Sequence, residues 1–154
     1  MLSYIGIKVI RFNFKILAYD KHIDTQFAKK NNVNYCELKY LMKNSDIISI
    51  HLNLSNETNN LINKNYLNFI KAESILVNTS RGEVLNEISL FNLLKNKKIL
   101  GAALDVFNKE PYSGKLLELN NVILTPHIAA YAREIRMKME IEAVNNLING
   151  ISGP

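Results

Sequence analysis

Residues 75–82, ILVNTSRG, decide how this chain folds, because three apolar residues are followed at once by polar ones. The polar residues begin where a buried strand should end, and in an open parallel sheet ligands bind at the carboxyl ends of the strands. There, the guanidinium of Arg81 can hold a planar carboxylate through two parallel hydrogen bonds, and Gly82 allows a sharp turn after it. By itself such a stretch more often holds an arginine in a salt bridge or at a helix cap, so the carboxylate-binding interpretation depends on the rest of the chain.

Short apolar runs alternate with helical patterns along the whole chain. Strands are expected at residues 15–19, 33–35, 46–51, 74–77, 99–104 and 121–124, with helices at 23–31, 37–42, 65–71, 87–96 and 130–149. The run 46–51 is continuously apolar up to His51, which predicts a strand covered on both faces, as in a parallel sheet. Strands that alternate with helices predict an α/β fold with a doubly wound parallel sheet of the Rossmann type.

Polar residues stand at the ends of these predicted strands. They are Asp20, His51, Arg81, Asp105 and His127. Because the carboxyl ends of parallel strands meet at one edge of a sheet, we expect one crevice lined by these side chains.

Composition limits the classes of partner. The chain has 154 residues, 47% hydrophobic and 21% charged, which is typical of one globular domain with a sizeable core. The net charge of +5 comes from dispersed lysines with no basic block interleaved with aromatics, so we expect no nucleic-acid partner. No apolar run approaches the roughly 20 residues that span a bilayer, so we expect no membrane association.

A single cysteine, Cys36, excludes an internal disulfide and fits the reducing cytosol, so we expect a cytoplasmic protein. No histidine lies close to it in the sequence, which favours a buried or inert thiol over a nucleophile.

Four segments together resemble one family. They are SDIISIHL at 45–52, VNTSRGEV at 77–84, GAALDVF at 101–107 followed by Glu110 and Pro111, and LTPHIA at 124–129. In this order and spacing they resemble the NAD-binding domain of the D-isomer-specific 2-hydroxyacid dehydrogenases. Within that family the chain is most similar to the D-3-phosphoglycerate dehydrogenases, and then to the glyoxylate or hydroxypyruvate reductases.

The resemblance implies an NAD-dependent oxidoreductase that acts on the CH–OH group of a D-2-hydroxyacid, of the 3-phosphoglycerate or the hydroxypyruvate and glyoxylate type. In it, Arg81 holds the substrate carboxylate, and His127 protonates the carbonyl as hydride arrives and acts as the base in reverse. Glu110 hydrogen-bonds the imidazole, and an adjacent carboxylate favours the charged form of a histidine. Taken singly, His127 would suit a structural histidine after a proline turn and Glu110 a surface acid.

The resemblance also implies residues that hold NAD. Asp20 corresponds to the acidic residue that binds the adenosine ribose hydroxyls, and a carboxylate there repels the 2′-phosphate of NADP. Thr79 and Asp105 correspond to positions near the nicotinamide ribose and carboxamide, with the backbone up to Ala130 alongside. Asn53, which replaces the proline of the family's His-x-Pro-Leu loop, belongs to the same cofactor-binding set.

Tyr4, Ile5 and Gly6 correspond to the turn that binds the pyrophosphate. Met1 and Ser3 stand where the first two glycines of a G-x-G-x-x-G turn would fall. The strand that precedes this turn in the family is missing, so we expect a sheet that lacks its first strand.

We therefore expect residues 1–150 to be the NAD-binding domain, truncated at its amino end, and residues 151–154 to begin the return to an absent substrate domain. The chain resembles the carboxyl-terminal portion of a dehydrogenase, paired as a homodimer, with a small 2-hydroxyacid or 2-oxoacid as substrate. If the reading frame begins at Met1, we expect no measurable turnover with NADH and hydroxypyruvate, because no second domain closes the cleft. The alternative is a non-catalytic NAD-binding remnant or a corepressor-like binding module.

Overall fold

The structure is a computed structural model that describes residues 14–152. Strands and helices alternate along these residues as the sequence predicts. In chain order they are β1 (Ile16–Ala18), α2 (Thr25–Asn31), β2 (Val33–Tyr35), α3 (Leu38–Asn44), β3 (Ile47–Ile50), α4 (Lys64–Leu67), β4 (Ile75–Asn78), the 3-10 turn η1 (Gly82–Val84), α5 (Glu87–Lys95), β5 (Gly101–Leu104), the 3-10 turn η2 (Lys115–Glu118), β6 (Val122–Leu124) and α6 (Arg133–Ser152).

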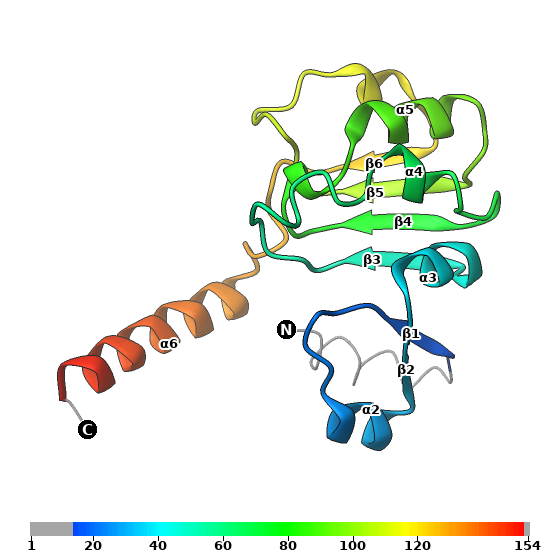
Figure 1. The fold of residues 1–154 in the computed structure, drawn as a ribbon. Coiled ribbons are helices and arrows are strands. Elements are labelled where there is room, and N and C mark those ends of the chain that lie inside the picture. The colour runs from blue at the N-terminus through cyan, green and yellow to red at the C-terminus, as the bar shows by residue number, and fades with distance from the viewer. Residues whose placement is uncertain (1–13, 153–154) are drawn as a thin grey trace.

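The strands pair only in parallel and form two sheets. β1 pairs with β2, and β3, β4, β5 and β6 are neighbours in that order. Within residues 14–152 no strand joins β1 to β3, and Figure 1 shows the small sheet on the β3 side of the larger one. The predicted α/β class with parallel sheets is confirmed.

Asparagine and aspartate side chains begin three of the helices. Asp24 accepts a hydrogen bond from the Phe27 N–H at the start of α2, and Asn86 accepts one from the Ser89 N–H at the start of α5. Asn63 does the same for α4. Such caps satisfy backbone donors that the first turn of a helix leaves free, so the polar residues between the apolar runs fix where the helices begin.

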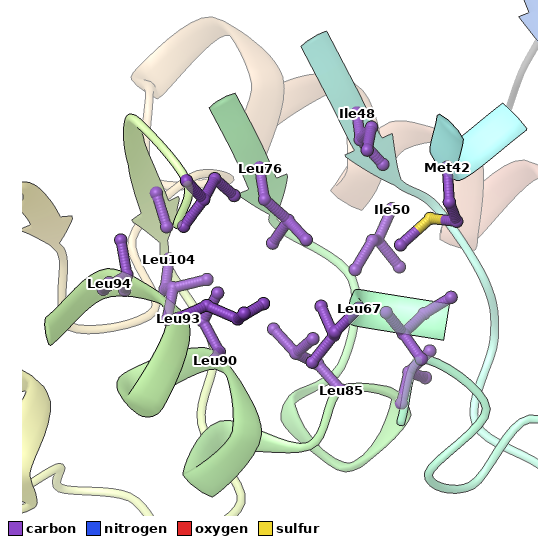
Figure 2. Close-up of a cluster of buried hydrophobic side chains, with 14 of the residues drawn as sticks. Met42, Ile48, Ile50, Leu67, Leu76, Leu85, Leu90, Leu93, Leu94 and Leu104 are labelled. Atoms are coloured by element: carbon purple, nitrogen blue, oxygen red, sulfur yellow. The ribbon is translucent and has the colours of Figure 1, made fainter. Parts of the chain in front are cut away.

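One face of the four-stranded sheet carries the hydrophobic core. Leu76 and Leu104 on neighbouring strands are 0% and 2% exposed, and they pack with leucines of α4 and α5. Figure 2 shows this layer, with Leu90 of α5 and Leu67 of α4 facing the strands. Each fully buried side chain of this size contributes about 1.5–3 kcal/mol, so this layer supplies most of the hydrophobic stabilisation.

The opposite face of the same sheet is open in the described residues. Ile47, Ile75 and Ile123 are 60%, 37% and 67% exposed. The prediction that the strand at 46–51 is covered on both faces is therefore wrong within residues 14–152. The strands β3, β4 and β5 follow one another across the sheet in chain order, and crossovers between parallel strands are right-handed. Both connecting helices, α4 and α5, therefore lie on the same face of the sheet, and they leave the other face uncovered.

Helix α6 projects away from both sheets (Figure 1), and its residues from Arg133 to Ile151 are all exposed. Ile135, Met139 and Leu147, which the sequence places on one side of this helix, are 47%, 55% and 62% exposed. In the part of the chain that the structure describes, no helix is both long and apolar enough to cross a membrane.

Cys36 follows β2 as a free, partly buried thiol. Burial, with a smaller contribution from the neighbouring Glu37 carboxylate, raises the pKa of this thiol. Because the thiolate is the reactive form, a raised pKa makes Cys36 a poor nucleophile, in keeping with the predicted inert thiol.

Candidate active site

The carboxyl ends of the four core strands lie at one edge of the sheet. The last residues of these strands are register partners, in the order Ile50, Asn78, Leu104 and Leu124. The residues that follow them therefore emerge side by side, and they are His51, Thr79, Asp105 and Thr125. The sheet thus brings together strand ends that are up to 74 residues apart in the sequence, from His51 to Thr125.

Asn78, the last residue of β4, shapes the turn that carries Arg81. Its side chain is fully buried, its amide nitrogen donates to the Arg81 carbonyl at 3.0 Å, and its amide oxygen accepts from the Ser80 N–H and Oγ at 3.0 and 2.8 Å. The Arg81 side chain is exposed, and its Nη1 donates to the Ser80 carbonyl at 2.6 Å. This bond engages one of the five guanidinium N–H donors, so the group retains the capacity to bind a carboxylate.

Gly82 holds the Arg81 turn against the loop that carries Glu110. A Cβ at Gly82 would lie 2.0 Å from the carbonyl carbon of Phe107 and 2.5 Å from the backbone nitrogen of Asn108. No side chain fits in that space, so glycine is needed here for the close approach of two backbones.

Two carboxylates fix the backbone of this loop. Glu110 accepts the Phe107 N–H through Oε1 at 3.1 Å, and Glu87 of α5 accepts the Asn108 N–H through Oε1 at 2.6 Å. Burial raises the pKa of Glu87, partly offset by its hydrogen bond from Asn108. The loop is therefore tied both to itself and to the helix beneath it.

Glu110 also meets His127. Its Oε2 lies 2.9 Å from His127 Nδ1, with 37% of the glutamate side chain and 50% of the histidine side chain exposed. The hydrogen bond from His127 is the main cause of a lowered pKa of Glu110. The imidazole is thus oriented by a carboxylate through Nδ1, which leaves Nε2 as the nitrogen for proton exchange with a ligand.

Asp105, at the end of β5, is buried at 4% exposure and bonded to the segment that carries His127. Its carboxylate accepts from Thr125 Oγ1 at 2.5 Å and from the Ile128 and Ala129 N–H groups at 2.9 Å each. Burial raises the pKa of Asp105, but these hydrogen bonds together outweigh burial and lower it.

The cofactor-binding residues implied by the resemblance fall into three groups. Thr79 and Ala130 lie beside Asp105, because the Asp105 N–H donates to the Asn78 carbonyl and Ala130 follows the bonded Ala129. Tyr4, Ile5 and Gly6 lie outside the described residues.

Asp20 and Asn53 form the third group, on the loops after β1 and β3. Asp20 Oδ1 accepts the His22 N–H at 3.0 Å, and the Asn53 carbonyl accepts from Thr58 Oγ1 at 2.6 Å. Lys21 pairs with Glu57, which links the end of β1 to the loop after β3. A partly exposed carboxylate after β1 can accept hydrogen bonds from a pair of ribose hydroxyls, so Asp20 fits the adenosine half of NAD.

His51 bonds within its own strand rather than to the other site residues. Its Nε2 lies 2.8 Å from Ser49 Oγ, and burial lowers its pKa. A histidine held by a hydroxyl of the preceding strand has a structural hydrogen bond at the strand end.

Three residues of the site were not singled out by the sequence. Asn78 shapes the Arg81 turn, Glu87 holds the Glu110 loop and Thr125 bonds Asp105. A buried polar residue at the end of an apolar strand is a signal that could have identified Asn78. Nothing in the sequence around Glu87 indicates a partner 21 residues further on.

The comparisons with known proteins identify a family and a fold. The model of the family "D-isomer specific 2-hydroxyacid dehydrogenase, NAD binding domain" matches residues 5–129. A glyoxylate reductase of Korarchaeum cryptofilum is 41% identical over 96% of this chain and 46% of its own length. A D-3-phosphoglycerate dehydrogenase of Archaeoglobus fulgidus is 34% identical over 99% of this chain and 30% of its own length.

A solved structure shares the fold. D-lactate dehydrogenase from Aquifex aeolicus, complexed with NAD and lactic acid, superposes with a TM-score of 0.84 at 30% identity, over 98% of this chain and 50% of that one. The chain thus spans half or less of the length of these relatives.

Proposed function

Because the chain belongs to the family of D-isomer-specific 2-hydroxyacid dehydrogenases through its NAD-binding domain, we propose that it carries the acid–base and carboxylate-binding residues of an NAD-dependent oxidoreductase. The reaction is on the CH–OH group of a D-2-hydroxyacid, or in reverse on a 2-oxoacid such as glyoxylate, hydroxypyruvate or the 3-phosphoglycerate-derived oxoacid. The observation that carries the proposal is the 2.9 Å contact between His127 Nδ1 and Glu110 Oε2 beside the Arg81 turn.

Arg81 provides the binding energy for the substrate carboxylate. Its exposed guanidinium can form two parallel hydrogen bonds to that group, which orients the adjacent carbonyl as well as holding it. The turn is rigid because the buried Asn78 amide bonds both Ser80 and the Arg81 carbonyl. A fixed turn lowers the conformational entropy lost when substrate binds.

His127 moves the proton. Through Nε2 it donates a proton to the substrate oxygen in the reduction and accepts it in the oxidation, while Nδ1 stays bonded to Glu110. The Glu110 carboxylate fixes the tautomer and stabilises the positive charge that the ring carries before it donates. Hydride transfer is the chemistry that bound NAD supplies.

Asp20 sets the choice of cofactor. Its carboxylate at the end of β1 accepts hydrogen bonds from ribose hydroxyls and repels a 2′-phosphate, so NAD binds more tightly than NADP. We propose residues 1–150 as the NAD-binding domain.

A binding titration on the purified chain tests the cofactor site. We expect saturable binding of NAD and weaker binding of NADP, with the preference lost in Asp20→Ser. Asp24→Asn is the matched control, because it removes a nearby carboxylate and keeps the hydrogen bond to the Phe27 N–H that begins α2. Failure of both cofactors to bind would contradict the proposal.

A second titration tests the substrate site. In the presence of NAD, glyoxylate should shift the imidazole resonances of His127 saturably, and Arg81→Gln should abolish the shift. Arg136→Gln on α6 removes an exposed arginine elsewhere and should leave the titration unchanged. Saturable NAD binding without any response to 2-oxoacids would favour a non-catalytic NAD-binding module.

We also propose a homodimer in the cytoplasm. The exposed isoleucines of the open sheet face and the apolar residues of α6 offer surface that association would bury, and a free cysteine suits a reducing compartment. Light scattering on the purified chain measures the mass, and a monomer at all concentrations would contradict the dimer.

A further inference from the structure

The backbone of His127 lies in an unfavourable region. Its φ is 55°, in the left-handed region that residues with a Cβ rarely adopt. Its N–H bonds the Thr125 carbonyl at 3.0 Å, so the chain reverses tightly around Pro126. A histidine keeps such a conformation only where neighbouring contacts impose it.

Those contacts come from one buried carboxylate. Asp105 bonds Thr125 Oγ1 on the amino side of His127 and the N–H groups of Ile128 and Ala129 on its carboxyl side. The three donors bracket the strained residue, and all three bonds are charge-assisted. Both oxygens of the carboxylate are engaged, since Oδ1 accepts two of the bonds and Oδ2 the third.

We infer that Asp105 and Thr125 are positioning residues that hold His127 in its left-handed conformation, so that the ring meets Glu110 and presents Nε2 to the substrate. The inference rests on the proposed acid–base role of His127. In this inference the Asp105 carboxylate binds the protein's own loop at residues 125–129. The family resemblance instead implies that Asp105 lies near the nicotinamide of the cofactor.

The site around Asp105 supports this assignment. The carboxylate is nearly fully buried at the end of β5, and its pKa is lowered by the same hydrogen bonds, so it is charged at neutral pH. A charged anchor holds amide and hydroxyl donors more strongly than a neutral one.

Exchange of the imidazole N–H proton tests the inference without turnover. In the full chain labelled with ¹⁵N-histidine, His127 Nδ1–H should give a slowly exchanging signal because it is bonded to Glu110. The chain has three histidines, so His127→Gln assigns the signal, and Glu110→Ala shows the effect of losing the hydrogen-bond acceptor. We expect Thr125→Val and Asp105→Asn to speed this exchange by about tenfold or more, the factor for losing one charge-assisted hydrogen bond.

Two further variants separate positioning from general stability. Thr125→Ser keeps the hydroxyl and should restore the slow signal. Ser74→Ala removes a buried hydroxyl that donates to the Ser45 carbonyl at 2.7 Å, at the other end of β4, and should lower the melting temperature without changing the His127 signal.

The inference would be overturned if Thr125→Val and Asp105→Asn lowered the melting temperature but left the exchange rate of the His127 Nδ1–H proton at the wild-type value. If Asp105→Asn does not fold, Thr125→Val decides, because it keeps the shape of the side chain. If NAD does not bind but both variants speed the exchange of the His127 Nδ1–H proton, the positioning inference stands and the proposed function fails.

Discussion

Replacing Gly82 by alanine tests how closely the arginine turn and the glutamate loop are coupled. The new Cβ would lie 2.0 Å from the Phe107 carbonyl carbon, 2.3 Å from its oxygen and 2.5 Å from the Asn108 nitrogen. Non-bonded carbon atoms rest at about 3.5–4.0 Å, so the two segments must separate by roughly 1.5 Å. The atoms that the new Cβ would meet all belong to the backbone, so no side-chain rotation can relieve the clash.

The expected cost follows from this displacement. Overpacking in a well-packed region costs about 1–3 kcal/mol. The moved segment includes Asn108, whose N–H bonds Glu87 at 2.6 Å, and weakening that bond adds about 1 kcal/mol. We expect Gly82→Ala to lower the free energy of unfolding by about 2–4 kcal/mol, which lowers the melting temperature by roughly 5–15 °C for a domain of this size.

Thermal and urea unfolding, followed by far-ultraviolet circular dichroism, measures the effect. Gly150→Ala is the matched control, because a Cβ at Gly150 in α6 meets nothing within 4 Å. It should be neutral or stabilising by up to about 1 kcal/mol, since alanine favours a helix over glycine. A Gly82→Ala protein as stable as the wild type, with an unchanged His127 N–H signal, would refute the coupling.

Three other outcomes are expected. The pKa of Asp105 is lowered in the folded state because its hydrogen bonds outweigh burial. The charged carboxylate therefore stabilises the fold at pH values above its unfolded pKa of about 4. This stabilisation is lost as the pH falls through the lower pKa of the folded state. Asp105→Asn should therefore flatten the dependence of the unfolding free energy on pH between about 5 and 3, as urea titrations would measure, and an unchanged slope would contradict this. Asn78→Ala should cost about 1–3 kcal/mol, because it leaves buried backbone groups of the Arg81 turn unsatisfied, and it should weaken binding of 2-oxoacids more than binding of NAD. Leu76→Ala should cost about 2–5 kcal/mol in the same denaturation assay, because the side chain is 0% exposed, and a smaller loss would mean that the core layer relaxes around the cavity.

Strand positions were predictable from the sequence, while the coverage of the sheet was not. The run 46–51 predicts a strand because three of its residues are β-branched isoleucines, and β3 covers Ile47–Ile50 within it. Its burial alternates, however, with Ile48 buried and Ile47 exposed. Which face is covered depends on where α4 and α5 cross the sheet, and an apolar run carries no information about that.

The site was predictable where residues stand at strand ends, because parallel pairing brings those ends together. This principle groups Asp105 with the segment around His127. The contact between Glu110 and His127 was implied by the family resemblance instead, and it is present. The positioning role inferred for Asp105 was not predictable, since it depends on hydrogen bonds to donors 20 to 24 residues further along the chain. The closeness of Gly82 to Phe107 depends in the same way on how two loops meet in space.

Because α6 is exposed, we expect its amide protons and those of the core strands to exchange with solvent at different rates. A helix of 20 residues whose side chains are exposed from Arg133 to Ile151 has little tertiary packing to stabilise it, and packing is the main source of helix stability in proteins. We therefore expect the amide protons of α6 to exchange faster than those of the buried strands β4 and β5. Any surface that covers α6 would reduce this difference, so its binding would appear first as slowed exchange in this helix.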